Sequence, residues 1–391
     1  MRNWPVIALR EVADISAGIT LGRKTRETDL IEVPYLRVAN VQDGQLVLTD
    51  IKTVAATRRE IERLTLRDGD LLLTEGGDMD KLGRGTCWRS QLPVCIHQNH
   101  IFRIRFSADR YDPDFVSLQV RSPYGKAYFL AHAKKTTGIA TINQQVLGDF
   151  PLLSPALKEQ QKVANLLKNM LTAFEGAKLA TIDQISDLTS LANAIIHESI
   201  LNTPVKSQLL GEVLVETKQG IGQRWNEYSV LGATRDGLAP AKEPVGKNPE
   251  RYKPVLPGTV FYNPMRILIG SIAMVDEDDT PGITSPDYVV LRGKEGLLDS
   301  RWFYYWLRSP EGERCIASLA RGAVRERMLF NRLAEGVINL PPYSVQLAAS
   351  QALAELRPLK LGIEARLRDI QLLPSRLLAR AFAVEEDTSH A

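Results

Sequence analysis

Residues 157–200 read LKEQQKVANLLKNMLTAFEGAKLATIDQISDLTSLANAIIHESI, and this stretch contains no proline. Apolar or small side chains recur in it at alternating intervals of three and four residues, with an interruption at Thr181. The spacing predicts one long helix with the seam of a coiled coil. At about 1.5 Å per residue, such a helix would be roughly 65 Å long. The seam residues are Val163, Leu167, Met170, Phe174, Ala177, Ile185, Leu188, Ala192 and Ile195.

A second stretch of the same kind, residues 344–383, stands near the C-terminus. Pro358 and Pro374 inside it predict a kink or a restart of the helix. Because neither apolar seam can stay in water, we expect the two helices to pack against each other. We expect them to be antiparallel, since each follows its own globular segment and the chain has to return. The apolar positions of the second helix are Leu353, Leu356, Ile363, Leu367, Ile370, Leu377 and Phe382.

The globular segments ahead of the two helices resemble each other. LREVADISAGI (9–19) corresponds to LGEVLVETKQGI (210–221), and three further pairs follow in the same order. The offset between the copies stays near 190–200 residues. This is far longer than a solenoid repeat and predicts a duplicated domain. The alternative is that two unrelated mixed domains share such elements by chance. The further pairs are 67–74 with 256–263, 114–129 with 300–316, and 150–161 with 337–348.

The sequence therefore predicts an α+β fold with two tandem pseudo-symmetric domains, separated and joined by two long antiparallel coiled-coil helices. We expect a first domain over residues 1–156, a central spacer helix over 157–202, a second domain over 203–342, and a C-terminal spacer helix and tail over 343–391. Two packed helices would hold the domains at a fixed separation, which a flexible linker cannot do. A DNA reader with two modules needs this property, because its half-sites lie at a defined distance along the duplex.

Composition limits the possible partners and compartment. The net charge is only +3, from 49 basic and 46 acidic residues, whereas proteins that bind DNA without sequence preference are usually far more basic. Any grip on DNA must come from local clusters or from a partner subunit. The cysteines, Cys87, Cys95 and Cys315, are too few for a disulfide framework and predict a reducing cytoplasm. The sequence has no apolar run long enough to span a bilayer and no apolar signal-peptide core, so we expect no membrane.

Three stretches point to a family: YLRVANVQDG (35–44), RDGDLLLTEGG (67–77) and TGIATINQQVLGDFPLLSPALKEQQKVANLL (137–167). In them the chain resembles the specificity subunit of type I restriction–modification systems. The resemblance covers essentially the whole chain, in the order domain, helix, domain, helix. The last stretch looks like the family's junction, with Glu159 and Gln160 near the start of the helix. The second copy departs from this pattern, because it has Val345 and Gln346 at that place.

The resemblance implies a function. Each domain would be a target-recognition domain that reads one half of a bipartite target in double-stranded DNA. The helices would set the unread spacer and dock two modification subunits, which are adenine methyltransferases; a motor-nuclease restriction subunit can join the assembly. The chain itself would catalyse nothing and would need no cofactor. Two alternatives stay open: a scaffold or adaptor that organises partner subunits through its coiled coil, and an enzyme of an unfamiliar type.

Direct readout of DNA needs polar and basic side chains on loops that reach base edges. The strongest candidates are KKTTGIATINQQ (134–145) and RGAVRERMLFNR (321–332), since each lies just ahead of a strand–proline–helix junction. A run of charge is more often a solvated face, but its recurrence in both copies favours contact with DNA. The candidate residues are Lys134, Lys135, Thr136, Thr137, Thr141 and Asn143 in the first copy, and Arg321, Arg325, Arg327 and Arg332 in the second.

Weaker candidates lie on other loops. The glycine-rich loop 74–86 offers Lys81 and Arg84, although a solvated hairpin turn explains it equally well. Arg37 and Asn40 could read bases, or Asn40 could cap a turn. In the second copy the candidates are Lys247 and Arg251 on the loop 246–253, and Asn263 and Arg266 in 262–266.

Two patterns imitate other sites. Cys87, Cys95, His97 and His100 lie close together, but their spacing fits no common zinc template, so we predict no metal site. NLPPY (339–343) resembles the Asn-Pro-Pro-Tyr motif of amino-methyltransferases, but Leu340 interrupts it and no glycine-rich cofactor loop precedes it. We predict no methyl-transfer site there.

Overall fold

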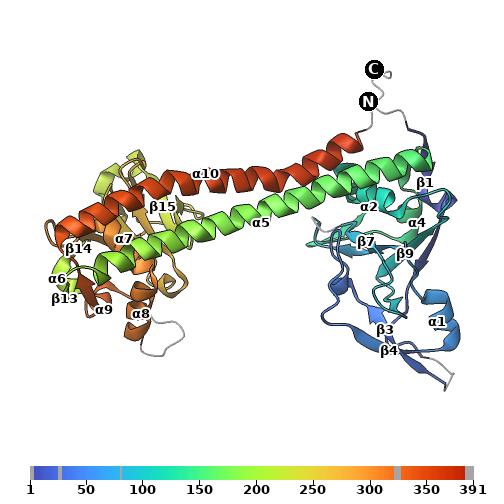
Figure 1. Cartoon of the computed structure of the whole chain (residues 1–391), viewed down its shortest axis with the longest axis horizontal. Helices are drawn as coiled ribbons and strands as arrows, with labels where there is room; N and C mark the ends of the chain where they lie inside the picture. Colours follow the sequence, from blue (N-terminus) through green and yellow to red (C-terminus); the bar gives the residue numbers. More distant parts are fainter. Residues whose placement is uncertain (1–3, 25–28, 80–81, 321–326, 384–391) are drawn as a thin grey trace. The chain divides into compact units, whose positions relative to one another are not determined.

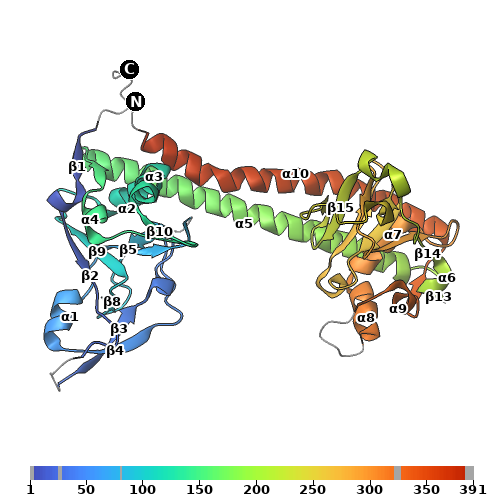
Figure 2. The same cartoon turned by 180° about the vertical axis from the view of Figure 1, so that it is seen from behind.

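The structure, a computed structural model, describes residues 4–24, 29–79, 82–320 and 327–383. The chain divides into two compact units: unit 1 comprises Met1–Leu179 with Arg368–Ala391, and unit 2 comprises Ala180–Leu367. Two long helices, α5 (Leu157–Leu201) and α10 (Tyr343–Ala381), each run from one unit into the other. They lie side by side in Figure 1 and in the reverse view of Figure 2. The interruption at Thr181 does not break α5, since this side chain is buried within a continuous helix.

The long helices are paired and antiparallel, as predicted. In unit 1, Val163 and Leu167 near the start of α5 share a hydrophobic core with Leu378 near the end of α10. In unit 2, Ile196 near the end of α5 shares a core with Leu353 near the start of α10. Full burial of such a side chain contributes about 1.5–3 kcal/mol. The pairing of opposite ends in the two units confirms the predicted direction.

The prolines of α10 do not divide it. The helix is continuous through Pro358 and Pro374, so the predicted restart is wrong. A proline inside a helix costs about 3 kcal/mol because it removes one hydrogen bond and crowds the preceding turn. The buried side chains of Leu353, Ile370 and Leu378 hold the helix against other elements on both sides of the prolines. Tertiary packing of this kind decides helix stability more than local propensity does.

Each unit contains a four-stranded antiparallel sheet with the same order of strands. The order β2-β9-β5-β7 in unit 1 corresponds to β14-β21-β18-β19 in unit 2. This shared topology supports the predicted duplication. The strands of unit 1 are β2 (Ala13–Ala17), β5 (Leu71–Thr74), β7 (Gly85–Cys87) and β9 (Ile101–Phe106). Those of unit 2 are β14 (Leu214–Glu216), β18 (Thr259–Tyr262), β19 (Ile272–Val275) and β21 (Val289–Gly293).

A second sheet also recurs, with additions. In each unit a central strand pairs antiparallel on one side and parallel on the other: β3 with β4 and β8, and β15 with β16 and β20. Unit 2 adds β17 (Lys253–Val255) beyond β20, and unit 1 adds the helix α1 (Arg58–Leu64). The strands are β3 (Ile31–Leu36), β4 (Lys52–Ala56), β8 (Ile96–His97), β15 (Ser229–Thr234), β16 (Gly237–Pro240) and β20 (Gly282–Thr284).

A pair of helices joined at a serine follows the central sheet in each unit. The predicted Arg-Ser-Pro ends are present, and the serine at each of them also starts the next helix. Ser122 and Ser309 are fully buried, and their hydroxyls accept from the backbone N–H groups of Gly125 and Gly312. Proline at the first helical position suits this start, because it has no N–H to lose. The helices are α2 (Pro113–Arg121), α3 (Pro123–His132), α7 (Ser300–Arg308) and α8 (Pro310–Leu319).

A buried glutamine ties each long helix to its unit. Gln160 accepts from the backbone N–H of Asp112 at 3.0 Å and donates to the carbonyl of Pro155 at 2.8 Å. Gln346 accepts from the N–H of Asp299 at 2.9 Å and donates to the carbonyl of Pro341 at 2.9 Å. Both glutamines are 1% exposed. The feature that both junctions retain is therefore the glutamine, whereas the neighbouring residue that differs between the copies, Glu159 in the first, is exposed.

Candidate nucleic-acid interface

The strongest predicted segment of unit 1 forms a hairpin. Its strands are β10 (Lys134–Thr136) and β11 (Ile139–Thr141), and Gly138 at the turn has a φ of 84°. Figure 2 labels β10 close to α3, the helix that precedes it. Strand β11 also pairs with β6 (Gly76–Gly77), so that the order is β10-β11-β6. The structure thus joins two predicted segments, 134–145 and the glycine-rich loop, in one small sheet.

The hairpin presents cations and hydroxyls to solvent. Lys134, Lys135, Thr136 and Thr137 are all exposed, and neither lysine forms an ion pair within the described residues. Because neighbouring side chains on a strand point to opposite faces, the two lysines lie on opposite faces of the hairpin. Ala140 on the facing strand is fully buried and belongs to the core of unit 1. The hairpin is therefore anchored while its polar side chains stay available, as contacts with phosphates and base edges require.

The remaining predicted residues near the hairpin have local roles. Asn143 is the N-cap of α4 (Gln144–Gly148), where its side-chain oxygen accepts from the N–H of Val146 at 2.8 Å. Arg84 is half-buried and donates to the side chain of Gln42 at 2.8 Å. It stands in the hairpin of β5 and β7, not at the tip of the loop, since its carbonyl accepts from the N–H of Thr74. Lys81 lies outside the described residues.

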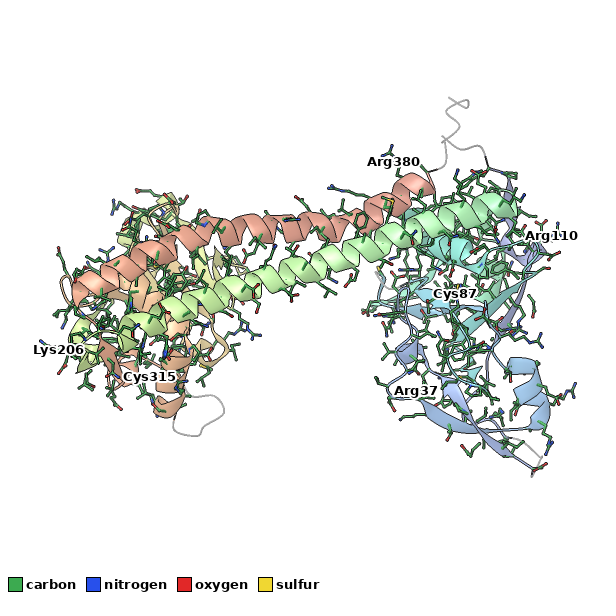
Figure 3. The ribbon with its side chains drawn as sticks, in the orientation of Figure 1. Arg37, Cys87, Arg110, Lys206, Cys315 and Arg380 are labelled. Carbon is green, nitrogen blue, oxygen red and sulfur yellow. The ribbon has the colours of Figure 1, made fainter. Side chains whose placement is uncertain are left out.

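Arg37 and Asn40 make contacts that favour the structural alternative. Asn40 is 3% exposed, accepts from the N–H of Arg37 at 2.8 Å and donates to the carbonyls of Val47 and Asp50. The Arg37 guanidinium donates to the carboxylate of Asp50 at 2.6 Å and to the backbone carbonyl of Asp50 at 2.9 Å. Figure 3 shows Arg37 near β3 and β4, well apart from Cys87 in the same unit. These two side chains therefore stabilise a loop.

In unit 2, the described part of the segment 321–332, from residue 327 on, lies beside the segment 262–266. Asn263, Pro264 and Arg266 follow β18, and the N–H of Met328 donates to the carbonyl of Pro264 at 3.0 Å. In unit 1 the N–H of Ile142 donates to the carbonyl of Glu75, which follows the equivalent strand β5, at 2.8 Å. In both copies, therefore, the chain ahead of the junction runs beside the end of the same central strand.

The arginines of this segment differ in their surroundings. Arg327 is half-exposed and pairs at 3.0 Å with Asp287, which is more exposed still. Such a pair contributes about 0–1 kcal/mol, so a phosphate can replace the carboxylate at little cost. Arg332 is half-buried on α9 (Phe330–Leu333). Arg321 and Arg325 lie outside the described residues. Arg266 is exposed, whereas the Asn263 side chain accepts from the N–H of Met265 at 2.9 Å and shapes the turn.

A second group of cations in unit 2 includes residues that the sequence analysis missed. Lys247 and Arg251 are exposed, as predicted for loop residues, and Arg251 ends the short helix η5 (Pro249–Arg251). This helix lies against η4 (Gly222–Glu227), since the N–H of Ile221 donates to the carbonyl of Tyr252. Helix η4 adds the exposed Arg224 and the half-exposed Trp225. An aromatic ring among cations is a recognisable signal of nucleic-acid binding, and QRWN (223–226) contains it.

The cysteine and histidine group behaves as a structural one. Burial raises the pKa of the Cys87 and Cys95 thiols to about 12 each and lowers the pKa of His97 to about 4. Zinc ligands need the thiolate, which burial disfavours here. His100 pairs with Glu75 at 2.6 Å. In the described residues no group of histidine, cysteine and acidic side chains could hold a metal ion. Among the same residues, no helix has the length and apolar character to cross a membrane.

The geometry defines a class: duplicated α+β domains with polar loops, joined by a pair of long helices. No protein-family profile matches the chain. It is 21% identical over 376 residues to the putative type I restriction enzyme MjaX specificity subunit of Methanocaldococcus jannaschii, a match that covers 90% of this chain and 86% of that protein. It is 22% identical over 168 residues to the type I restriction enzyme EcoKI specificity subunit of Escherichia coli (strain K12), covering 42% of this chain and 36% of that protein.

Solved structures share the fold over nearly the whole chain. A chain from a structure that describes complex assembly and conformational transition of the type I R-M system matches with a TM-score of 0.68, 16% identity and 97% of both chains covered. The HsdS subunit of Thermoanaerobacter tengcongensis matches with a TM-score of 0.53, 17% identity and coverage of 97% and 96%. Over nearly its whole length, the chain is thus similar to the specificity subunits of type I restriction–modification enzymes.

Proposed function

We propose that the chain reads a bipartite target in double-stranded DNA, one half with each unit. The observation that supports this most directly is the equivalent path of the two polar segments. Ile142 and Met328 form matching hydrogen bonds beside the ends of β5 and β18, so these two residues occupy one position in two copies of a fold. A reader of two half-sites needs this duplication of a reading surface.

The residues proposed to contact DNA fall into two chemical groups. Cations contact phosphates and set the register, whereas hydroxyl and amide groups read base edges. The net charge of +3 is too small to attract DNA by itself, so these local groups must supply the grip. The phosphate contacts we propose are Lys134 and Lys135 in unit 1, and Lys247, Arg251, Arg266 and Arg327 in unit 2. The candidates for base readout are Thr136, Thr137 and Thr141.

We also propose that α5 and α10 set the unread spacer and dock two modification subunits, with a motor-nuclease restriction subunit joining the assembly. Helix α5 has 45 residues, which at about 1.5 Å each gives roughly 68 Å of continuous helix. Both helices keep large apolar side chains exposed, and such exposure is typical of a protein–protein contact. The exposed fractions are 55% for Leu166, 54% for Leu179, 56% for Leu359 and 49% for Leu372. The domain boundaries and the cytoplasmic location remain predictions.

Selection from random duplexes tests the proposal. The chain, assembled with its modification subunits, should enrich a split motif whose two halves stand at one spacing. The rival proposal is a scaffold that organises subunits without reading DNA, and the low net charge and the exposed apolar residues favour it. Assembly of the subunits without enrichment of any motif would refute DNA reading and support the scaffold. A chain that enriches only one half-site would refute the bipartite target.

A further inference from the structure

A group of charged side chains joins the globular part of unit 1 to its long helix. Asp114 on α2 pairs with Arg89, which lies just beyond β7, at 2.5 Å, and with Lys168 on α5 at 2.6 Å. The side chains of Arg89, Asp114 and Lys168 are 40%, 24% and 50% exposed. Pairs that are this exposed add little to stability. Their position between a loop, a short helix and a long helix is therefore the feature to explain.

Unit 2 has a corresponding group. Arg301 on α7 pairs with Asp276, which lies just beyond β19. Arg357 on α10 pairs with Asp276 at 3.4 Å and with Asp279 at 2.5 Å. These side chains are more buried, with exposed fractions from 13% for Asp276 to 28% for Arg357. In this unit too, ion pairs connect a loop, a short helix and a long helix.

The two short-helix positions are equivalent. The N-cap aspartates of α2 and α7 correspond, because the backbone N–H of each donates to the buried glutamine of its long helix. Asp114 and Arg301 each follow their cap by two residues. The same position therefore has an acid in unit 1 and a base in unit 2.

The two loop positions are equivalent as well. The N–H of Gly69 donates to the carbonyl of Trp88, and the N–H of Gly258 donates to the carbonyl of Val275, both at 2.9 Å. Arg89 and Asp276 are the next residues after these carbonyls. Here the base is in unit 1 and the acid in unit 2. The pair between loop and short helix has thus exchanged its charges between the two copies.

The charged side chain on the long helix has the same sign in both units, but it pairs with a different element in each. It is a cation in both units, but Lys168 binds the acid on the short helix whereas Arg357 binds the acids on the loop. Counted from the buried glutamines, Arg357 stands about one helical turn further along its helix than Lys168. The cation of each helix therefore matches the acid of its own unit only.

We propose that this exchanged charge pair matches each globular part to its own long helix and excludes the helix of the other copy. The glutamine contact cannot do this, since it is the same in both units. On a helix with the charges of unit 1, a globular part with the charges of unit 2 would place Arg301 at the lysine. Like charges held in contact suppress a wrong pairing more strongly than an exposed pair stabilises the right one.

A cycle of variants in the full chain tests the matching. Arg89→Asp with Asp114→Arg gives unit 1 the charges of unit 2 and sets the new arginine against Lys168. Lys168→Glu alone sets a glutamate against Asp114. Combining all three changes restores opposite charges between positions 89 and 114 and between positions 114 and 168. Asp68, which pairs with Arg89 at 3.6 Å, faces an aspartate in the double and in the triple variant alike. We expect each mismatched chain to unfold at a lower temperature, and hydrogen exchange over residues 157–171 to quicken by roughly three- to tenfold. The triple variant should recover most of what the double variant loses, because the contact with Asp68 is the same in both.

The control is Asp43→Arg, which breaks the ion pairs of Asp43 with Arg121 and Lys126 in the same unit. It should leave exchange over residues 157–171 unchanged. The proposal is overturned if the losses of stability in the two mismatched chains simply add in the triple variant. It is equally overturned if the mismatched chains behave as the Asp43 control does. These readouts involve no DNA, so they stand whether or not the chain reads a bipartite target.

Discussion

Unit 1 and unit 2 have the same backbone elements where they meet the long helices, with exchanged charges on them, and differ in their added elements elsewhere. The four-stranded sheet, the serine between two helices and the buried glutamine recur position by position. The additions stand in other places: α1 in unit 1, and β17 and η5 in unit 2. The backbone elements that attach each unit to the long helices are the same in both copies, whereas the loops that would read DNA differ. This is the division expected when a scaffold is retained and its specificity changes.

The largest effect is expected at the equivalent helix leucines. Leu167 and Leu353 each stand seven residues after the buried glutamine and are 3% and 0% exposed. Leu167→Ala and Leu353→Ala should each lower the free energy of unfolding by about 2–5 kcal/mol, as measured by denaturant titration. Leu166→Ala is the control, since Leu166 is 55% exposed, and it should change little. A large loss at only one of the two leucines would show that the units are not held alike.

Acid should lower the stability of unit 1 more than that of unit 2. Burial lowers the pKa of His97 in unit 1 to about 4, and its ring nitrogen Nδ1 contacts the carbonyl of Ile101 at 2.9 Å. Between about pH 6.5 and pH 4 the unfolded chain binds a proton there that the folded chain does not, so stability falls as the pH falls. The expected loss is about 3 kcal/mol. Hydrogen exchange of each unit against pH measures it.

The histidine of unit 2 provides the internal control. His197 is 58% exposed, whereas His97 is fully buried. His97→Gln should flatten the pH dependence of unit 1 and leave that of unit 2 as it was. Equal acid sensitivity of both units in the wild type, or an unchanged slope in the variant, would contradict the assignment to His97.

The buried glutamines should act as a matched pair. Gln160→Leu and Gln346→Leu each remove the side-chain partner of one partly buried backbone N–H and of two backbone carbonyls, at a cost of about 1–3 kcal/mol for each group left unpaired. Partial relaxation should limit the decrease in stability to about 2–3 kcal/mol in either unit, measured by denaturant titration. Glu159→Val copies the residue of the second junction at an exposed position and should be neutral. A neutral Gln346→Leu would mean that the second junction is held in another way.

The smallest effects are expected on the reading loops. Replacing Lys134 and Lys135 together by alanine should weaken DNA binding of the assembled complex. The slope of log affinity against log salt concentration should become shallower by about 0.9 for each phosphate that is no longer neutralised. Arg327→Ala should have a smaller effect, because Asp287 already neutralises this arginine. Titrations of binding against salt measure both. Unchanged slopes would remove these residues from the interface.

Sequence patterns with a regular period were reliable. The seams of α5 and α10 repeat over many turns, and the direction of pairing followed from chain order alone. Of the kink or restart predicted at the prolines of α10, the restart is wrong, because packing on both sides maintains a helix that local propensity opposes. The order of four short motifs was sufficient to reveal the duplication, because both copies keep that order.

The contacts of the candidate site residues could not be predicted from the sequence as well as the fold. The pairing of Thr141 with Gly76 joins short strands far apart in the chain, and no local pattern specifies such a register. Asn40 looks the same in a sequence whether it caps a turn or reads a base. The exchanged charges of Asp114 and Arg301 become visible only when the hydrogen bonds of their caps align the copies.

The proposed reading of two half-sites by two like units requires that α5 and α10 set the distance between the half-sites. Mapping adenine methylation in cells that express the chain and its modification subunits tests it most directly. One helical turn is inserted after Ala180, with a matching turn in α10. We expect the same two half-sites at a changed spacing, or loss of methylation. Methylation of the original target at the original spacing would contradict it.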